Sequence, residues 1–150
     1  MIKFVLSNRY VELALRFLLG FTFLFASIDK ISEPSAFATA IDNYRLITGP
    51  ASLAIATVLP WIELLCGFAL LSGLYSRGAT FLLGVLLSIF TVAVLTGLIR
   101  GLDISCGCFT LDPSVHRIGW MKVLENLGLI LVSLILFYSE SSRIVLKAES

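Results

Sequence analysis

Charged residues are scarce in this chain of 150 residues: Asp, Glu, Lys and Arg together make up 14%, against roughly 25% in an average soluble domain. The eleven basic and ten acidic residues nearly cancel, and no run of basic residues occurs. Composition therefore gives no reason to expect nucleic acid as a partner, and no polybasic segment for an anionic membrane surface.

Hydrophobic residues, in contrast, make up 58% of the chain, and the mean hydropathy is +0.98. These values are typical of an integral membrane protein, and the length suits a single domain over residues 1–150. Four apolar stretches approach the 20 residues that cross a bilayer. The expected spans are residues 11–28, 51–74, 78–99 and 118–138. We predict an all-α membrane protein, an antiparallel bundle of four transmembrane helices with both termini on one side.

The connections between these spans differ in length. Only residues 75–77 join the second and third spans, which predicts a tight hairpin, whereas two long connections lie together on the opposite face. In the first of them Pro34 signals a helix start, and Phe37, Ile41 and Tyr44 follow at helical spacing. This pattern indicates either a short amphipathic interfacial helix or a loop with three buried apolar anchors.

The second long connection contains Cys106-Gly107-Cys108. Two peptide units span up to about 7 Å, and a disulfide needs its Cα atoms roughly 4.4 to 6.8 Å apart, so a bridge requires the bend that Gly107 permits. Strained, exposed disulfides tend to be labile and catalytic. The pair is therefore a candidate reversible dithiol, with a permanent structural disulfide and a soft-metal thiolate pair as alternatives. No closed zinc site is expected, because four ligands are needed and only His116 is an obvious third.

Cationic groups in the same connection favour the thiolate form of these cysteines: Arg100, His116 and Arg117. His116 is the only histidine, and it is a candidate acid, base or thiolate partner or a solvated interfacial residue. Cys66 lies about 22 Å down its helix from the Cys-loop side. It is interpreted as a small buried apolar residue, with a relay thiol as the alternative.

Ionisable groups inside a span are costly and commonly functional. Arg16 and Glu63 each lie 12 residues from the end of their expected span nearest the Cys loop, so both are about 18 Å deep and are expected to form an ion pair in the core. Such a pair either fixes helix register or serves as a proton relay or cofactor contact. Asn126 is a candidate for an interhelical hydrogen bond or the same relay. Trp61 fits an interface or packing role, or stacking on a quinone.

Five motifs, taken together and in order, resemble the DoxX-like superfamily and, within it, the MauE group of small membrane proteins. They are Arg16-Phe17-Leu18-Leu19-Gly20, Asp29-Lys30-Ile31 followed by Pro34 and Phe37, Leu59-Pro60-Trp61-Ile62-Glu63-Leu64, Cys106-Gly107-Cys108-Phe109, and Glu125-Asn126-Leu127. The resemblance implies a four-helix bundle similar in plan to the quinone-linked disulfide-forming membrane enzymes, a thioredoxin-like periplasmic partner, and possible use of quinone as acceptor.

Five basic residues flank the spans on each side, so charge does not set the orientation. Disulfide exchange belongs to an oxidising compartment, which favours a periplasmic Cys loop and cytoplasmic termini in a bacterial inner membrane. We therefore expect a membrane thiol-disulfide oxidoreductase or electron-relay subunit. A soft-metal transporter or chaperone and a non-catalytic assembly subunit of a redox complex are the alternatives.

Overall fold

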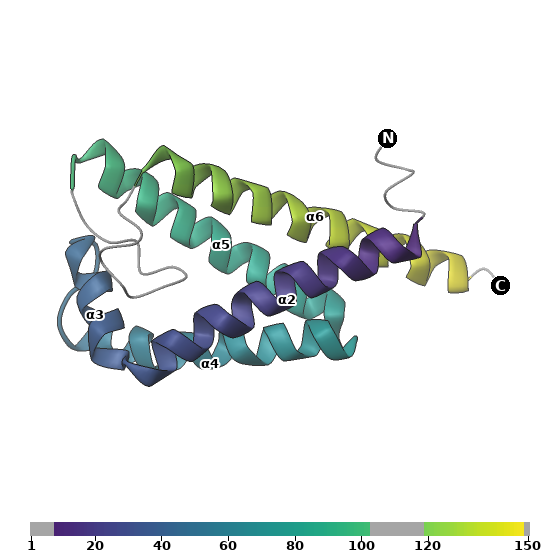
Figure 1. Cartoon of the computed structure of the whole chain (residues 1–150), viewed down its shortest axis with the longest axis horizontal. Helices are drawn as coiled ribbons and strands as arrows, with labels where there is room; N and C mark the ends of the chain where they lie inside the picture. The colour runs from purple at the N-terminus through teal and green to yellow at the C-terminus, as the bar shows by residue number, and fades with distance from the viewer. Residues whose placement is uncertain (1–7, 103–118, 149–150) are drawn as a thin grey trace.

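The computed structural model describes residues 8–102 and 119–148, the last nine of them as backbone only. These residues are helical apart from short connections, and no strand occurs among them (Figure 1). The helices are α2 (Arg9–Ser32), α3 (Pro34–Asn43), α4 (Pro50–Ser72), α5 (Ser76–Ile99) and α6 (Trp120–Ala148). Four of them, all except α3, contain stretches long and apolar enough to cross a membrane, which confirms the predicted helical membrane fold.

The long helices run antiparallel to their neighbours in the bundle. Helix α2 lies along α4, α4 and α5 form a hairpin, and α5 lies along α6 (Figure 1). The first turn of α2 and the last turn of α6 are at one end of the bundle. Helix α3, the end of α5 and the start of α6 are at the other end (Figure 1). Both long connections therefore belong to the same end, which we call the α3 end.

Proline and glycine set most of the helix boundaries. Pro34 and Pro50 occupy the first turns of α3 and α4, where a missing backbone N–H leaves no bond unmade. Gly73 ends α4 with a φ of 76°, a left-handed conformation that glycine adopts without steric penalty. The hairpin turn then occupies residues 73–75, two residues earlier than expected, because Gly73 ends the helix before the hydrophobic run stops.

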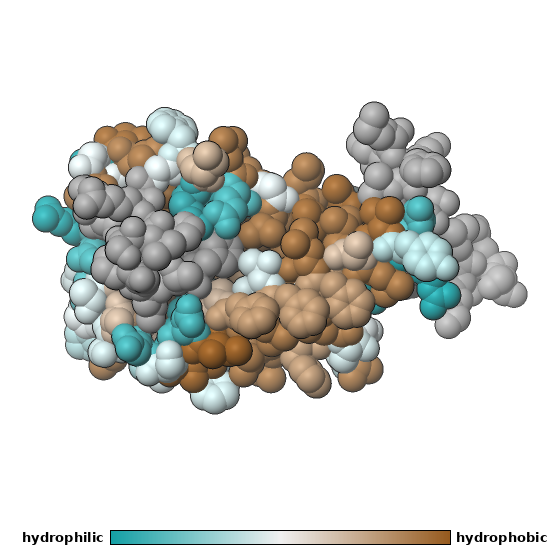
Figure 2. Space-filling view, viewed as in Figure 1, coloured by the Kyte–Doolittle hydropathy of each residue, from teal (hydrophilic) through white to brown (hydrophobic). Residues whose placement is uncertain are grey.

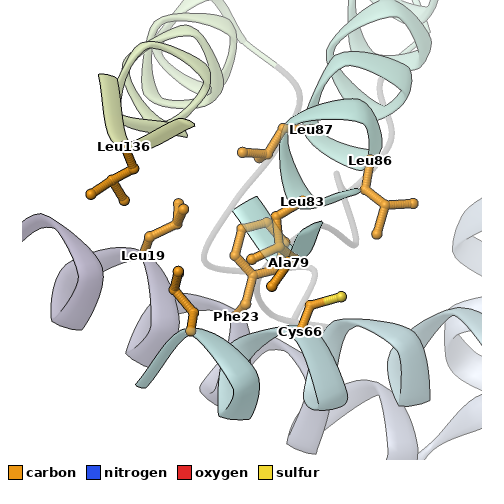
Figure 3. Packing of buried hydrophobic residues seen from close by; sticks show 9 residues of the cluster. Leu19, Phe23, Cys66, Ala79, Leu83, Leu86, Leu87 and Leu136 are labelled. Carbon is orange, nitrogen blue, oxygen red and sulfur yellow. The ribbon is translucent and has the colours of Figure 1, made fainter. Parts of the chain in front are cut away.

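Side chains from four helices meet in the main apolar core. Leu19 and Phe23 of α2, Cys66 of α4 and Leu136 of α6 point toward leucines of α5 (Figure 3). On the face shown in Figure 2, hydrophobic residues cover the middle of the molecule and polar residues gather toward its two ends. This distribution matches a protein whose outer middle surface contacts lipid.

Helix α3 confirms the expected short helix in the first connection, and its apolar stripe is turned inward. Phe37 is buried against Ala56 of α4, and Tyr44, just past the helix, is buried with Val94 of α5. The stripe thus anchors α3 on the bundle. Helix α3 begins only two residues after α2 ends. Pro34 lacks the backbone N–H that would continue the hydrogen bonds of α2, so one helix ends and the next begins at once.

Glycines allow α2 and α4 to approach closely. A Cβ atom added at Gly67 would lie 3.1 Å from the carbonyl oxygen of Gly20 and 3.2 Å from Cγ of Leu24. One added at Gly20 would lie 2.7 Å from Cδ2 of Leu71. Small residues at such crossings let helix backbones pack in lipid, where no hydrophobic force drives association. The contact between Gly20 and Gly67 therefore fixes the register of α2 on α4.

We predict that Gly67→Val destabilises the protein by about 1–3 kcal/mol, the usual range for overpacking, because the new side chain meets a backbone oxygen that cannot move independently. Thermal unfolding of the purified protein in detergent micelles measures the effect. Gly128→Val is the matched control, since a Cβ at Gly128 of α6 meets nothing within 4 Å. Equal unfolding temperatures for the two variants would contradict the proposed register.

Candidate functional site

A buried ion pair between Lys30 and Glu63 lies in the interior of the bundle. The Lys30 ammonium donates to both carboxylate oxygens of Glu63, at 2.8 and 3.0 Å. Only 2% of Lys30 and 0% of Glu63 is exposed. The same ammonium lies 5.0 Å from the ring centroid of Phe37 and 5.1 Å from that of Phe90. These four residues come from α2, α4, α3 and α5, so one cation joins four helices.

The predicted pairing of Arg16 with Glu63 is wrong. Arg16 is 14 residues before Lys30 on the same helix, or about 21 Å along its axis, while both oxygens of Glu63 are bonded to Lys30. The prediction took the span ends at residues 28 and 51 as equally deep. In the structure α4 extends past the end of α2 to pack against α3, because the register is set by Gly20 and Gly67.

Arg16 instead belongs to a polar cluster at the other end of the bundle. Its guanidinium donates to the Ser76 hydroxyl at 2.7 Å and lies 3.8 Å from the Glu12 carboxylate. The Ser139 hydroxyl donates to the other oxygen of Glu12 at 3.1 Å. The cluster ties the start of α2 to α5 and α6, and it is a structural contact remote from the α3 end.

Lys30 was missed as a core residue because the sequence prediction placed it in a connection beyond the first span. Its burial follows the inward face of α2, where Leu19, Phe23 and Ser27 precede it at helical spacing. The Cα–Cβ bonds of a helix tilt toward its N-terminus, so the Lys30 side chain is directed back toward the depth of Glu63. Extending the periodic stripe by one turn would have found it.

Asn126 of α6 is completely buried, with 0% exposed, and neither Oδ1 nor Nδ2 has a hydrogen-bond partner among the described residues. It faces α5, because Val123 packs with Val94 on one side of it and Ser133 lies against Gly84 on the other. The expected interhelical hydrogen bond is therefore not found in the described part of the chain. An unpartnered buried amide costs about 1–3 kcal/mol, so the site favours a bound group that both donates and accepts.

Three predicted site residues, Cys106, Cys108 and His116, fall outside the described residues. Trp61 lies on the outer face of α4 with 53% of its surface exposed, whereas Glu63 on the same helix faces inward. Cys66 is a free, buried cysteine packed in the main core. Among the described residues no three His, Cys, Asp or Glu side chains form a group able to hold a metal ion.

The geometry separates two kinds of polar interior site. In the Lys30 and Glu63 pair both charged groups are hydrogen-bonded to each other. The pair suits either a structural ion pair that fixes helix packing or a pair that holds a proton. Asn126 has unused hydrogen-bonding capacity and suits a ligand.

A further cation lies near the interior of α6, one turn before Asn126 and toward the α3 end. It is Lys122, whose ammonium donates to the Glu125 carboxylate at 2.6 Å.

We predict that Lys30→Met and Glu63→Met each destabilise the protein by about 3–5 kcal/mol, because each leaves one buried charge uncompensated. The double variant Lys30→Met/Glu63→Met is expected to lose less than either single variant. Thermal unfolding in detergent micelles provides the measurement.

The control for this comparison is the pair Arg16→Met and Glu63→Met, whose losses are expected to add, since distant sites are independent within about 0.5 kcal/mol. Additive losses for Lys30 and Glu63, together with non-additive losses for Arg16 and Glu63, would contradict the ion pair between Lys30 and Glu63. They would support a pair between Arg16 and Glu63 instead.

Comparison with known proteins identifies the family. Residues 8–139 match the family model described as methylamine utilisation protein MauE. Among curated proteins, the chain is 34% identical over 110 residues to the methylamine utilization protein MauE of Methylophilus methylotrophus. It is 32% identical over 123 residues to that of Paracoccus versutus, and 30% identical over 134 residues to that of Methylorubrum extorquens.

These alignments cover 73%, 81% and 89% of this chain, respectively. They cover 58%, 66% and 72% of the relatives, so the chain spans about two thirds of the length of the proteins it resembles. No solved structure matches the chain. With a family model that extends across all the described spans, the chain belongs to the MauE family of methylamine utilisation proteins.

Proposed function

We propose that this protein is a membrane thiol-disulfide oxidoreductase, or the electron-relay subunit of one, acting on a thioredoxin-like periplasmic partner through Cys106 and Cys108. The position of the Cys pair in the chain carries the proposal. Cys106 is four residues from Leu102, the last described residue after α5, and four residues span at most about 14 Å. The chain length thus keeps the pair within about 14 Å of Leu102, at the α3 end, and we propose that a water-soluble partner reaches it there.

In the proposed reaction a thiolate of the partner attacks one sulfur of the Cys106–Cys108 disulfide. The sulfur–sulfur bond breaks, a mixed disulfide forms, and the other cysteine of this chain leaves as a thiolate. A second thiolate of the partner then attacks the partner's own sulfur in the mixed disulfide. The partner leaves with a disulfide, and this chain keeps the two electrons as a dithiol. Reoxidation of that dithiol releases two electrons and two protons.

A membrane quinone suits this reoxidation, because a quinone takes up two electrons and two protons when it is reduced. Asn126 fits such a group: Nδ2 can donate to a carbonyl oxygen, Oδ1 can accept from a hydroxyl, and neither has a partner among the described residues. Asn126 is seven residues from Gly119, about 10 Å along α6 from the α3 end. Trp61, the other proposed cofactor contact, is on the outer surface and is apart from this interior position.

The family name places the curated relatives in methylamine utilisation. We propose that this chain serves the same system as an accessory redox protein of a bacterial inner membrane, with the Cys loop in the periplasm and the termini in the cytoplasm. Lys30 and Glu63 join α2, α3, α4 and α5 around the interior. The Glu63 carboxylate is the group that we propose to hold a proton there. Arg16 supports the opposite end and has no part in the proposed chemistry.

Replacing the cysteines tests the proposed reaction. We expect the single cysteine left in Cys106→Ser or Cys108→Ser to attack the disulfide of the oxidised partner, whose other sulfur leaves as a thiolate, and the mixed disulfide to be visible as a reducible adduct on a non-reducing gel. The double variant is expected to lose all partner oxidation while keeping its helical content. Cys66→Ala is the matched control and leaves the trapping unchanged, since Cys66 is enclosed in the apolar core.

The same variants separate the alternatives. Full activity of the double serine variant would contradict the redox proposal and favour a non-catalytic assembly subunit. Stoichiometric Cu(I) binding that needs both thiols, without any mixed disulfide, would favour a soft-metal transporter or chaperone instead.

A second variant tests the acceptor site. Asn126→Leu is expected to keep or raise the unfolding temperature, because it removes an unpartnered polar group, and to weaken binding of decylubiquinone at least tenfold. The increase in unfolding temperature with added decylubiquinone measures this binding. Asn43→Leu makes the same change at an exposed position of α3 and leaves binding unchanged. Unaltered quinone binding in Asn126→Leu would refute the assignment of Asn126.

A further inference from the structure

A cleft of about 590 Å³ lies between α3, α4 and α5. Its volume falls within the range of small-molecule sites, roughly 300–1,000 Å³. Fourteen residues line it, and all of them are apolar apart from Tyr44 and Ser88. Ile89 and Val92, on the α5 wall, are among the exposed hydrophobic residues, so the cleft opens on the outer surface of two membrane-spanning helices. Lipid therefore has direct access to it.

The lining suits a hydrocarbon chain better than a polar ring. A quinone head group needs donors for its two carbonyl oxygens, whereas the walls contributed by α4 and α5 offer almost only carbon. Phe37 and Phe90 close the inner side and separate the cleft from the ammonium of Lys30, with which both rings are in contact. Burial raises the pKa of Tyr44, so its phenol is uncharged at neutral pH. None of the described residues that line the cleft carries a charge.

Two arginines lie near each other where the cleft reaches the α3 end. Arg100 follows the last residue of α5 and donates to the backbone oxygen of Tyr44 at 3.1 Å. Arg45 is the next residue after Tyr44, is exposed, and has a left-handed φ of 54°. Ala93, in the cleft wall, is seven residues from Arg100, about 10 Å along α5. Folding thus creates a dibasic corner, Arg45 and Arg100, from residues that are 55 positions apart in the sequence.

We propose that the cleft binds an anionic phospholipid, with one acyl chain against α4 and α5 and the phosphate at the dibasic corner. Positive side chains at the membrane surface attract anionic head groups, each contributing about 1 kcal/mol, which is about a fivefold change in affinity. The apolar cleft and the two cations match the two halves of one amphiphile. This site is independent of the Cys pair and of the proposed redox function.

Lipid retention tests the site. The purified protein in detergent micelles is titrated with dioleoylphosphatidylglycerol or with zwitterionic dioleoylphosphatidylcholine, and native mass spectrometry counts retained lipid. We expect the anionic lipid to bind more tightly. Arg45→Gln/Arg100→Gln is expected to weaken its binding about 25-fold, fivefold for each arginine, and to leave the zwitterionic lipid unchanged. Arg77→Gln, the same change at the other end of α5, has no effect.

Filling the cleft tests the acyl-chain half separately. Ile89→Trp is expected to reduce retention of the anionic lipid, while Leu65→Trp, at an exposed position of α4 outside the cleft, leaves it unchanged. Equal affinity for the two lipids would overturn the anionic class. Retention of neither lipid, or normal retention in Ile89→Trp, would overturn the site.

Discussion

The ion pair between Lys30 and Glu63 is the interaction on which the arrangement of the helices depends. Removing one partner of a buried ion pair leaves an uncompensated charge and costs about 3–5 kcal/mol, so each residue depends on the other. The Lys30 ammonium also contacts Phe37 and Phe90, and each such contact contributes up to about 2 kcal/mol when desolvated. Moving α2, α3, α4 or α5 breaks part of this set, so the pair stabilises the packing whose α2–α4 register the contact between Gly20 and Gly67 fixes.

The two ends of the bundle differ in structure. At the end that carries the start of α2, Glu12, Arg16, Ser76 and Ser139 connect three helices through short polar contacts. At the α3 end, α3 and an apolar cleft pack beside α5, the helix that precedes the Cys pair in the sequence. Phe37 and Phe90 lie between this cleft and the ammonium of the buried pair. The proposed exchange with a partner, the proposed lipid site and the polar cluster around Arg16 therefore involve separate parts of the molecule.

Sequence reasoning predicted the four spans and the helix at Pro34, because hydrophobic length and proline position act locally. It did not predict the register between helices, which depends on the approach of Gly20 to Gly67 and not on where the hydrophobic runs end. That difference is why Glu63 was assigned to Arg16 and Lys30 was left in a loop. Asn126 was a candidate for an interhelical hydrogen bond or a relay from its type and depth, yet its lack of a partner among the described residues needed coordinates.

The proposed function requires that Cys106 and Cys108 form an exchangeable disulfide on the outer face of the membrane. Labelling intact cells with a membrane-impermeant thiol reagent, before and after mild reduction, tests the redox state and the location of the pair in one experiment. We expect no label on either cysteine before reduction and label on both afterwards. Labelling without reduction, or labelling only after the cells are permeabilised, would contradict it.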